Sequence, residues 1–186
     1  MMIPAENDPR PLVGISACLA GQRVRYDGRD KFSSAVAEQI APHCRLLAFC
    51  PEAVAGMGIP RPPVNLIQTS DGIRAVGRDA PHQDVTDRLQ TVALAFANSY
   101  PQLCGFILQS RSPSCGLDST PVYDPAQQQI LDPNGSGVFA RHLRQRFPDL
   151  PLLEDTHLTS ERIALFLEQV RERACRWAAL AAPPSA

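Results

Sequence analysis

Short apolar runs alternate with helical patterns along most of the chain. Residues 12–16, 45–50 and 104–108 are almost wholly apolar, which is typical of strands buried on both faces of a sheet. Residues 151–153 are expected to add a short strand. In the segments between and after these runs, apolar residues recur every three or four positions, which predicts helices at 33–40, 84–100, 136–147 and 159–177. This order predicts an α/β fold: a single three-layer domain with a central, mainly parallel sheet and helices on both faces.

Two other stretches carry the pattern of hairpins. Residues 64–68 and 73–76, joined by a Thr-Ser-Asp-Gly turn, predict one hairpin. Tyr123 and Ile130 are expected to flank a second small hairpin or turn. The proline-rich segment 51–63 is expected to be irregular, because Pro51 cannot continue a central strand.

Polar residues that precede three of the predicted helices are candidate N-caps. Their side chains can accept hydrogen bonds from the first free N–H groups of a helix. The candidates are Asp84, Ser136 and Thr159. Each one predicts that a helix starts at the residue that follows it.

The composition is typical of one soluble globular domain. The 186 residues are 44% hydrophobic and 20% charged, with a formal net charge of -1. A chain of this size buries roughly 70% of its unfolded surface, so it can form a core without disulfide bonds. We expect a single domain over residues 1–186, with its core at about 12–180 and flexible tails at 1–10 and 181–186.

Charge and hydropathy restrict the expected partners. No apolar run approaches the ~20 residues that a membrane-spanning helix needs, so we expect no membrane segment. The near-neutral net charge argues against bulk nucleic-acid binding.

The chain has six cysteines, which exceed what its core requires. They form about 3% of the residues, well below the share of a disulfide scaffold. Residues 1–10 contain no apolar secretion signal. We therefore expect a cytoplasmic protein in reducing surroundings, with thiols free for metal binding or chemistry.

Three cysteines follow the carboxyl ends of predicted buried strands. Cys18 lies two residues after the first strand, Cys50 ends the second, and Cys115 lies a few residues after the strand at 104–108. Ligands of open parallel sheets bind beyond these strand ends, so we expect the three thiols to share one crevice. The remaining cysteines begin strands or lie in the last helix, where a structural role is expected; they are Cys44, Cys104 and Cys175.

Three thiolates in one crevice are compatible with zinc, with an iron–sulfur cluster or with a nucleophile that needs no metal. The chain has no Cys-x-x-Cys pair, and none of its four histidines follows a strand end as the cysteines do, so no fourth zinc ligand is evident. A [4Fe–4S] cluster on three thiolates would keep one iron open as a Lewis acid for a soft atom such as sulfur. The residues favour the cluster, and the other two possibilities stay open.

Polar residues lie beside two of these thiols. Glu52 follows Cys50 by two residues and is either a candidate general acid or base or an ordinary loop cap. Ser112 and Ser114 flank a proline next to Cys115, where they are candidate substrate contacts or turn formers.

Two further segments are candidate anion sites. The loop after the first strand carries four basic residues: Arg23, Arg25, Arg29 and Lys31. The segment 135–137, Gly-Ser-Gly, precedes a predicted helix, where it is a weaker anion candidate or simply a helix cap.

Five short motifs occur in order along the chain. They are Ser16-Ala-Cys18-Leu, Arg25-Tyr-Asp-Gly28, Cys50-Pro-Glu52, Pro60-Arg-Pro-Pro63 and Ser112-Pro-Ser-Cys115-Gly116. Together they resemble the thiouracil desulfidase family, and the resemblance extends from about Leu12 to Val170. The resemblance implies a [4Fe–4S] cluster held by Cys18, Cys50 and Cys115 with one open iron. It also implies that Glu52 is the acid or base and that one serine polarises the substrate. Ser112 is the first candidate for this serine, and Ser114 is the second.

The activity implied by this resemblance is a non-redox desulfuration of a small molecule. A thiolated pyrimidine, namely 2-thiouracil, 4-thiouracil or its nucleoside or nucleotide, would become the oxo base and release hydrogen sulfide. The alternatives are an iron–sulfur sensor without catalysis and a zinc-binding module or hydrolase. Sulfide release and metal analysis distinguish the three.

Overall fold

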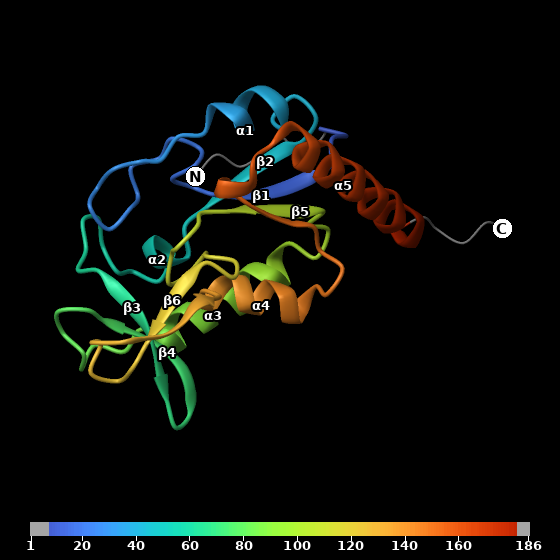
Figure 1. Ribbon diagram of the computed structural model, residues 1–186. Helices are drawn as coiled ribbons and strands as arrows, with labels where there is room; N and C mark the ends of the chain where they lie inside the picture. Colours follow the sequence, from blue (N-terminus) through green and yellow to red (C-terminus); the bar gives the residue numbers. More distant parts are fainter. Residues whose placement is uncertain (1–7, 182–186) are drawn as a thin grey trace.

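Figure 1 shows the fold as a computed structural model, which describes residues 8–181. The expected tails at 1–10 and 181–186 fall largely outside these residues. Within the described part, Arg10 pairs with Asp8 at 2.6 Å and donates to the carbonyl oxygen of Ala41 at 2.9 Å.

The first sheet is parallel and four-stranded, with the order β2-β1-β5-β8. Its strands are β1 (Leu12–Ser16), β2 (Arg45–Phe49), β5 (Gly105–Leu108) and β8 (Leu152–Glu154). Every residue of β1 and β5 is buried, which explains why these strands show no alternation of polar and apolar positions. Ile15 pairs with Ala48 on one side and with Ile107 on the other, so β1 lies at the centre.

Helices cover both faces of this sheet, which confirms the predicted three-layer α/β fold. They are α1 (Ser34–Gln39), α3 (Thr86–Ser99), α4 (Val138–Arg146) and α5 (Ser160–Ala181). On one face, Phe106 of β5 packs edge-on against Phe96 of α3 and Phe139 of α4, with ring centroids 5.8 and 5.3 Å away. On the other face, Val13 shares a core cluster with Val36 of α1 and other residues of α1 and α5.

A second four-stranded sheet, with the order β4-β3-β6-β7, lies beside the first. Its strands are β3 (Val64–Thr69), β4 (Gly72–Gly77), β6 (Thr120–Tyr123) and β7 (Ile130–Gly135). The two predicted hairpins are confirmed as the antiparallel pairs β3–β4 and β6–β7. Their parallel pairing, in which Leu66 faces Val122, joins segments far apart in the chain, and the local pattern did not predict it.

The expectation that the segment 51–63 is irregular is wrong at its start, which forms the short helix α2 (Pro51–Val54). Proline stands at the first helical position, where its missing N–H group has no bond to make. One turn of helix is too short to produce an apolar period, so the pattern did not reveal it.

The predicted caps have different outcomes. Thr159 accepts from the N–H of Arg162 at 3.3 Å, as expected at the start of α5. Asp84 accepts from the N–H of Thr86 at 2.9 Å, although the residue that precedes α3 is Val85. The expectation for Ser136 is wrong, because its hydroxyl is engaged by Asp118 and Gly137 stands at the cap.

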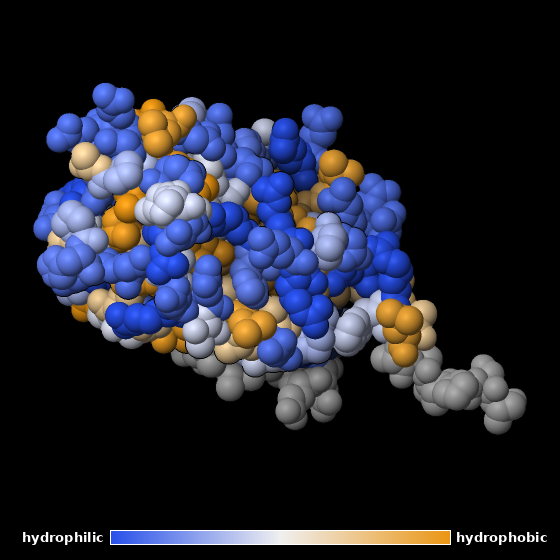
Figure 2. All heavy atoms as spheres, turned by 90° about the horizontal axis from the view of Figure 1, so that it is seen from below, coloured by the Kyte–Doolittle hydropathy of each residue, from blue (hydrophilic) through white to orange (hydrophobic). Residues whose placement is uncertain are grey.

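Within residues 8–181, none of the helices has the length and apolar composition that crossing a membrane requires. Figure 2 shows one face of the molecule, on which hydrophilic residues predominate and apolar residues form small separate groups.

A short 3₁₀ turn, η1 (Asp155–His157), connects β8 to α5.

Candidate functional site

A cavity of about 530 Å³ opens where β1, β2 and β5 of the first sheet end. Its inner wall contains residues at or just after these strand ends, including Ser16, Phe49 and Gln109. Its outer wall includes Val64 and Asn65 at the start of β3, in the second sheet. The cavity therefore lies between the two sheets, at the edge where ligands of parallel sheets bind.

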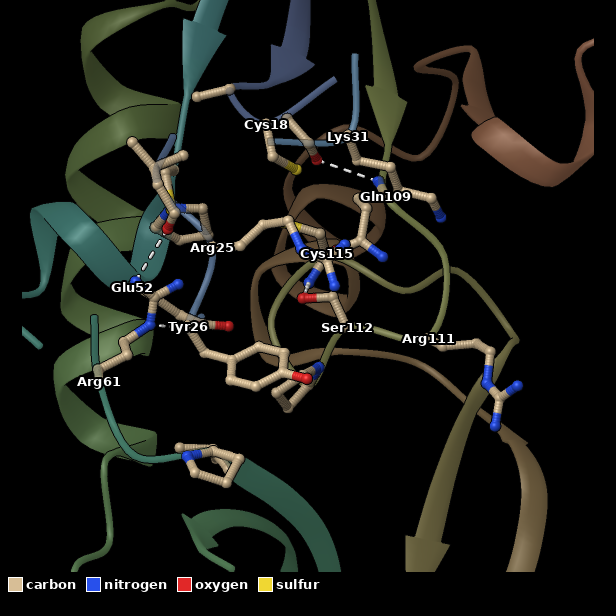
Figure 3. A pocket seen from close by; sticks show the side chains of 18 of the residues that line it. Cys18, Arg25, Tyr26, Lys31, Glu52, Arg61, Gln109, Arg111, Ser112 and Cys115 are labelled. Carbon is tan, nitrogen blue, oxygen red and sulfur yellow. Dashed lines mark hydrogen bonds and ion pairs between the residues drawn. The ribbon is translucent and has the colours of Figure 1, made fainter. Parts of the chain in front are cut away.

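The three cysteines that follow strand ends all line this cavity, and Figure 3 labels two of them, Cys18 and Cys115. Cys18 comes two residues after β1, and Cys50 stands between β2 and α2. Cys115 lies in the connection from β5 to β6 and is 6% exposed. The other cysteines lie elsewhere: Cys44 and Cys104 are buried directly before β2 and β5, and Cys175 is exposed on α5.

Burial raises the pKa of each cavity thiol. The pKa of Cys18 is raised to about 11, mainly by desolvation and further by the neighbouring Cys50. Desolvation also raises the pKa of Cys50 and, well above its ordinary value, that of Cys115. The thiols are therefore protonated at neutral pH in the absence of a bound group, and a metal that binds them must displace these protons.

The donor set suits a soft metal centre, because three thiols face one cavity and sulfur ligands favour iron–sulfur clusters, zinc and copper(I). Among residues 8–181, no three His, Cys, Asp or Glu side chains form a group able to hold one metal ion. The three cavity cysteines are compatible with a soft metal centre because they line one cavity.

Glu52 projects from α2 and is 8% exposed. Its Oε2 accepts from Nε of Arg61 at 2.6 Å, and its Oε1 accepts from the hydroxyl of Ser114 at 2.7 Å. Arg61 is itself fixed, because its Nη1 donates to the carbonyl oxygens of Val24 and Gly58 at 2.9 and 3.0 Å. Glu52 is therefore a buried, paired carboxylate at the cavity wall, not an exposed loop cap.

The two candidate serines occupy different positions. Ser112 lines the cavity, and its Oγ accepts from the N–H groups of Ser114 and Cys115 at 3.2 and 3.0 Å. Ser114 is 1% exposed and directs its hydroxyl to Glu52. Ser112 can therefore contact a molecule in the cavity, whereas Ser114 holds the carboxylate.

Comparisons with known proteins identify the family of this chain. Residues 13–155 match the 2-thiouracil desulfurase family. The chain belongs to this family. The matched stretch contains all three cavity cysteines, Glu52 and Ser112, and the resemblance inferred from the five motifs is confirmed.

Two individual proteins are similar to this member of the desulfurase family. An uncharacterised protein of Bacillus subtilis, YbbK, is 30% identical over 143 residues, which cover 72% of this chain and 90% of that protein. A solved structure of a [4Fe–4S]-dependent thiouracil desulfidase, TudS, has a TM-score of 0.64 and 29% identity. That likeness covers 86% of this chain and 99% of the solved chain.

Arg61 is a residue of the cavity that sequence reasoning missed. It is 8% exposed, lines the cavity and forms the ion pair with Glu52. The signal was present, because an arginine between prolines at 60 and 62 is held in a rigid loop. The motif Pro60-Arg-Pro-Pro63 contains this arginine, but its local sequence does not indicate that Arg61 pairs with Glu52.

The basic loop after β1 contributes only partly to the cavity. Arg25 and Lys31 line it, together with Arg78 and Arg111 from other segments. Lys31 is held by Asp155 at 2.6 Å. The side chains of Arg23 and Arg29 are 82% and 83% exposed and do not line the cavity.

The segment 135–137, the weaker anion candidate, has another role. The first N–H groups of α4, from Val138 and Phe139, donate to the carbonyl oxygens of Pro113 and Ser114, both at 2.9 Å. These donors are therefore engaged by the loop that carries Cys115 and are not directed to an anion. A Cβ on Gly137 would lie 2.4 Å from the carbonyl of Ser114, so this close approach requires glycine.

Proposed function

We propose that the protein is a thiouracil desulfidase that converts a thiolated pyrimidine, such as 2-thiouracil, into the oxo base. One water enters and one hydrogen sulfide leaves, so both protons of the water end on sulfur and no electrons are exchanged. The observation that carries the proposal is the convergence of three thiols and a paired carboxylate on one cavity. A volume of about 530 Å³ is in the range of small-molecule sites.

Cys18, Cys50 and Cys115 would hold a [4Fe–4S] cluster with one open iron. This assignment is supported by the shared cavity wall and by the [4Fe–4S] dependence of the similar solved protein. When bound, the cluster supplies a Lewis acid that attracts the thiocarbonyl sulfur and makes the adjacent carbon electrophilic.

Glu52 would accept a proton from the water that attacks this carbon. The Ser114 hydroxyl can rotate away from Oε1 and free it for the water, while Arg61 retains its bond to Oε2. The second oxygen thus stays anchored while the first exchanges partners. The same carboxyl group would return this proton to the departing sulfur. The second proton, on the hydroxyl group newly bonded to carbon, would also pass to the sulfur as the carbonyl forms, so both protons of the water end on sulfur.

Ser112 would polarise the substrate. Its oxygen already accepts from two backbone N–H groups, so its hydroxyl proton can point towards a molecule in the cavity. A donor fixed in this way is already oriented for charge that develops on the substrate.

The test is sulfide release under anaerobic conditions. Protein reconstituted with iron and sulfide should convert 2-thiouracil into equal amounts of uracil and hydrogen sulfide without consuming an oxidant or a reductant. Absence of product from iron-loaded protein, with 4-thiouracil and thiolated nucleotides also tested, would contradict the proposal and favour a sensor. Bound zinc in place of iron would instead favour the zinc module.

A Glu52→Gln variant tests the role of the carboxylate. Glutamine can accept from Arg61 through its oxygen and donate to Ser114 through its amide, so the local structure should persist. We expect a rate lower by about 10²- to 10⁴-fold at unchanged iron content, because glutamine cannot accept the proton. Full turnover by this variant would exclude Glu52 as the base.

A further inference from the structure

One aromatic side chain of the cavity wall is used neither in the core nor in the arrangement of the carboxylate. Tyr26 lies between β1 and α1, lines the cavity and is 45% exposed. Figure 3 shows its ring projecting into the space between Arg61 and Ser112. Among residues 8–181, no ring-to-ring contact includes Tyr26, and its side chain is contacted by the guanidinium of Arg25, so the exposed part of its ring is available to a ligand.

Backbone hydrogen bonds position the chain at Tyr26 relative to Glu52. The carbonyl oxygen of Tyr26 accepts from the N–H of Arg61 at 2.8 Å. The side chain of that same Arg61 pairs with Glu52 at 2.6 Å. A tight turn closes behind Tyr26, where Gly28 adopts a φ of +73° and donates to the carbonyl of Arg25 at 2.9 Å. Tyr26 and Glu52 are therefore connected through one arginine.

The chemistry of the ring indicates its ligand. An exposed aromatic face in a site attracts another planar, conjugated ring, and such stacking is independent of where the hydrogen-bonding groups of that ring lie. The guanidinium carbon of Arg25 lies 5.8 Å from the Tyr26 ring centroid and adds a cation to the same aromatic system. Hydrogen bonds from the polar cavity residues, by contrast, depend on where the polar atoms of a ligand lie and not on the conjugation of its ring.

We propose that Tyr26 is the stacking platform for the pyrimidine ring and selects planar, conjugated thiocarbonyl compounds over saturated ones. This inference rests on the proposed desulfidase function and names the residue that would distinguish its substrates. Tyr26 acts on ring orientation and takes no part in proton transfer.

Binding of uracil, the expected product, tests stacking without turnover. Equilibrium dialysis of uracil against the iron-loaded protein compares wild type with Tyr26→Phe, Tyr26→Leu and Tyr26→Met. We expect phenylalanine to retain the affinity, and leucine and methionine to weaken it by about 5- to 150-fold, because base–aromatic stacking has this size. Iron content and melting temperature provide the folding controls. Because both Tyr26→Leu and Tyr26→Met are measured, the result does not depend on either variant alone.

Selectivity between two substrates provides the second measurement. 5,6-Dihydro-2-thiouracil keeps the thiocarbonyl group but has a puckered ring. The ratio of kcat/KM for 2-thiouracil over this compound should fall by a similar factor in Tyr26→Leu and stay near the wild-type ratio in Tyr26→Phe. The loss should lie mainly in KM, because the proton-transfer groups are unchanged.

The outcomes separate the two proposals. If wild-type protein releases sulfide but Tyr26→Leu binds uracil and discriminates as wild type does, the stacking role is wrong and the desulfidase function stands. An equal loss in Tyr26→Phe would also overturn stacking, because it would assign the effect to the hydroxyl group. If iron-loaded wild type releases no sulfide from any thiolated pyrimidine, the function itself fails.

Discussion

At the scale of single residues, the hydrogen bonds of Glu52 separate anchoring from exchange. Arg61 is a charged donor held by two backbone carbonyls, whereas Ser114 is a neutral donor on a rotatable hydroxyl. Charge-assisted hydrogen bonds are the stronger class, so the serine is the partner that a substrate water can replace. The two sides of one carboxylate thus have different tasks.

This difference predicts distinct effects of the two serines. Ser114→Ala removes one hydrogen bond to the carboxylate, so we expect about a 10-fold lower kcat with an unchanged KM. Ser112→Ala removes the donor that faces the substrate and should lower kcat by about 10²-fold. Steady-state kinetics of iron-loaded variants measure both effects. Ser99→Ala, on the exposed side of α3, is the matched control, and equal losses at positions 112 and 114 would contradict the assignment.

At the scale of elements, α4 fixes the loop that carries Cys115. The first N–H groups of the helix donate to Pro113 and Ser114, and Gly137 lets the two backbones approach closely. The connection from β5 to β6 is therefore supported by an element that follows it in the chain. A helix whose apolar residues pack in the core thus also shapes the site.

A single methyl group tests this support. In Gly137→Ala the new Cβ would meet the backbone of Ser114, so the loop must shift. We expect a loss of about 1–3 kcal/mol in unfolding free energy, measured by denaturant titration, together with reduced iron content and activity. Ser136→Ala is the adjacent control: it removes bonds to Asp118, outside the cavity wall, and should reduce stability while activity per bound iron is retained. If Gly137→Ala is as active as wild type, the loop does not depend on this contact.

The elements also indicate which parts of the fold the sequence could predict. β1 and β5 were recognisable because burial on both faces makes every position apolar. The helix α2 was missed because four residues are too few for a period, and Ser136 was misassigned because Asp118, distant in sequence, engages its hydroxyl. Patterns in the local sequence predict structure that local interactions determine. Such predictions fail where a residue distant in sequence determines the structure.

At the scale of the whole molecule, the two sheets explain which parts of the site were predictable. The three cysteines could be grouped because strand ends of one parallel sheet lie at one edge. The second sheet, and with it the outer wall of the cavity, depends on the parallel pairing of Leu66 with Val122, which no local pattern specifies. The ion pair of Glu52 with Arg61 escaped prediction for a similar reason, because it depends on how the chain leaves the first sheet and enters the second.

The placement of the thiols at the two ends of the first sheet predicts their effect on iron binding. Cys18→Ala should lower iron and sulfide content sharply after anaerobic reconstitution, because it removes one ligand. Cys44→Ala and Cys104→Ala should retain the metal, because both residues precede their strands. Iron analysis and the visible spectrum measure the outcome. Full iron content in Cys18→Ala, or its loss from a stably folded Cys44→Ala, would contradict the assignment.

The connections from β2 to β3 and from β5 to β6 each cross from the first sheet to the second. The first carries Cys50, Glu52 and Arg61, and the second carries Ser112 and Cys115. The segments that carry the proposed ligands thus begin on a parallel sheet, while the facing wall contributes no thiol. The architecture is therefore modular for protein engineering. Residues of the outer wall such as Asn65 of β3 and Arg78 after β4 can be varied to change which molecules enter, while the segments that carry the proposed reactive groups keep their sequence.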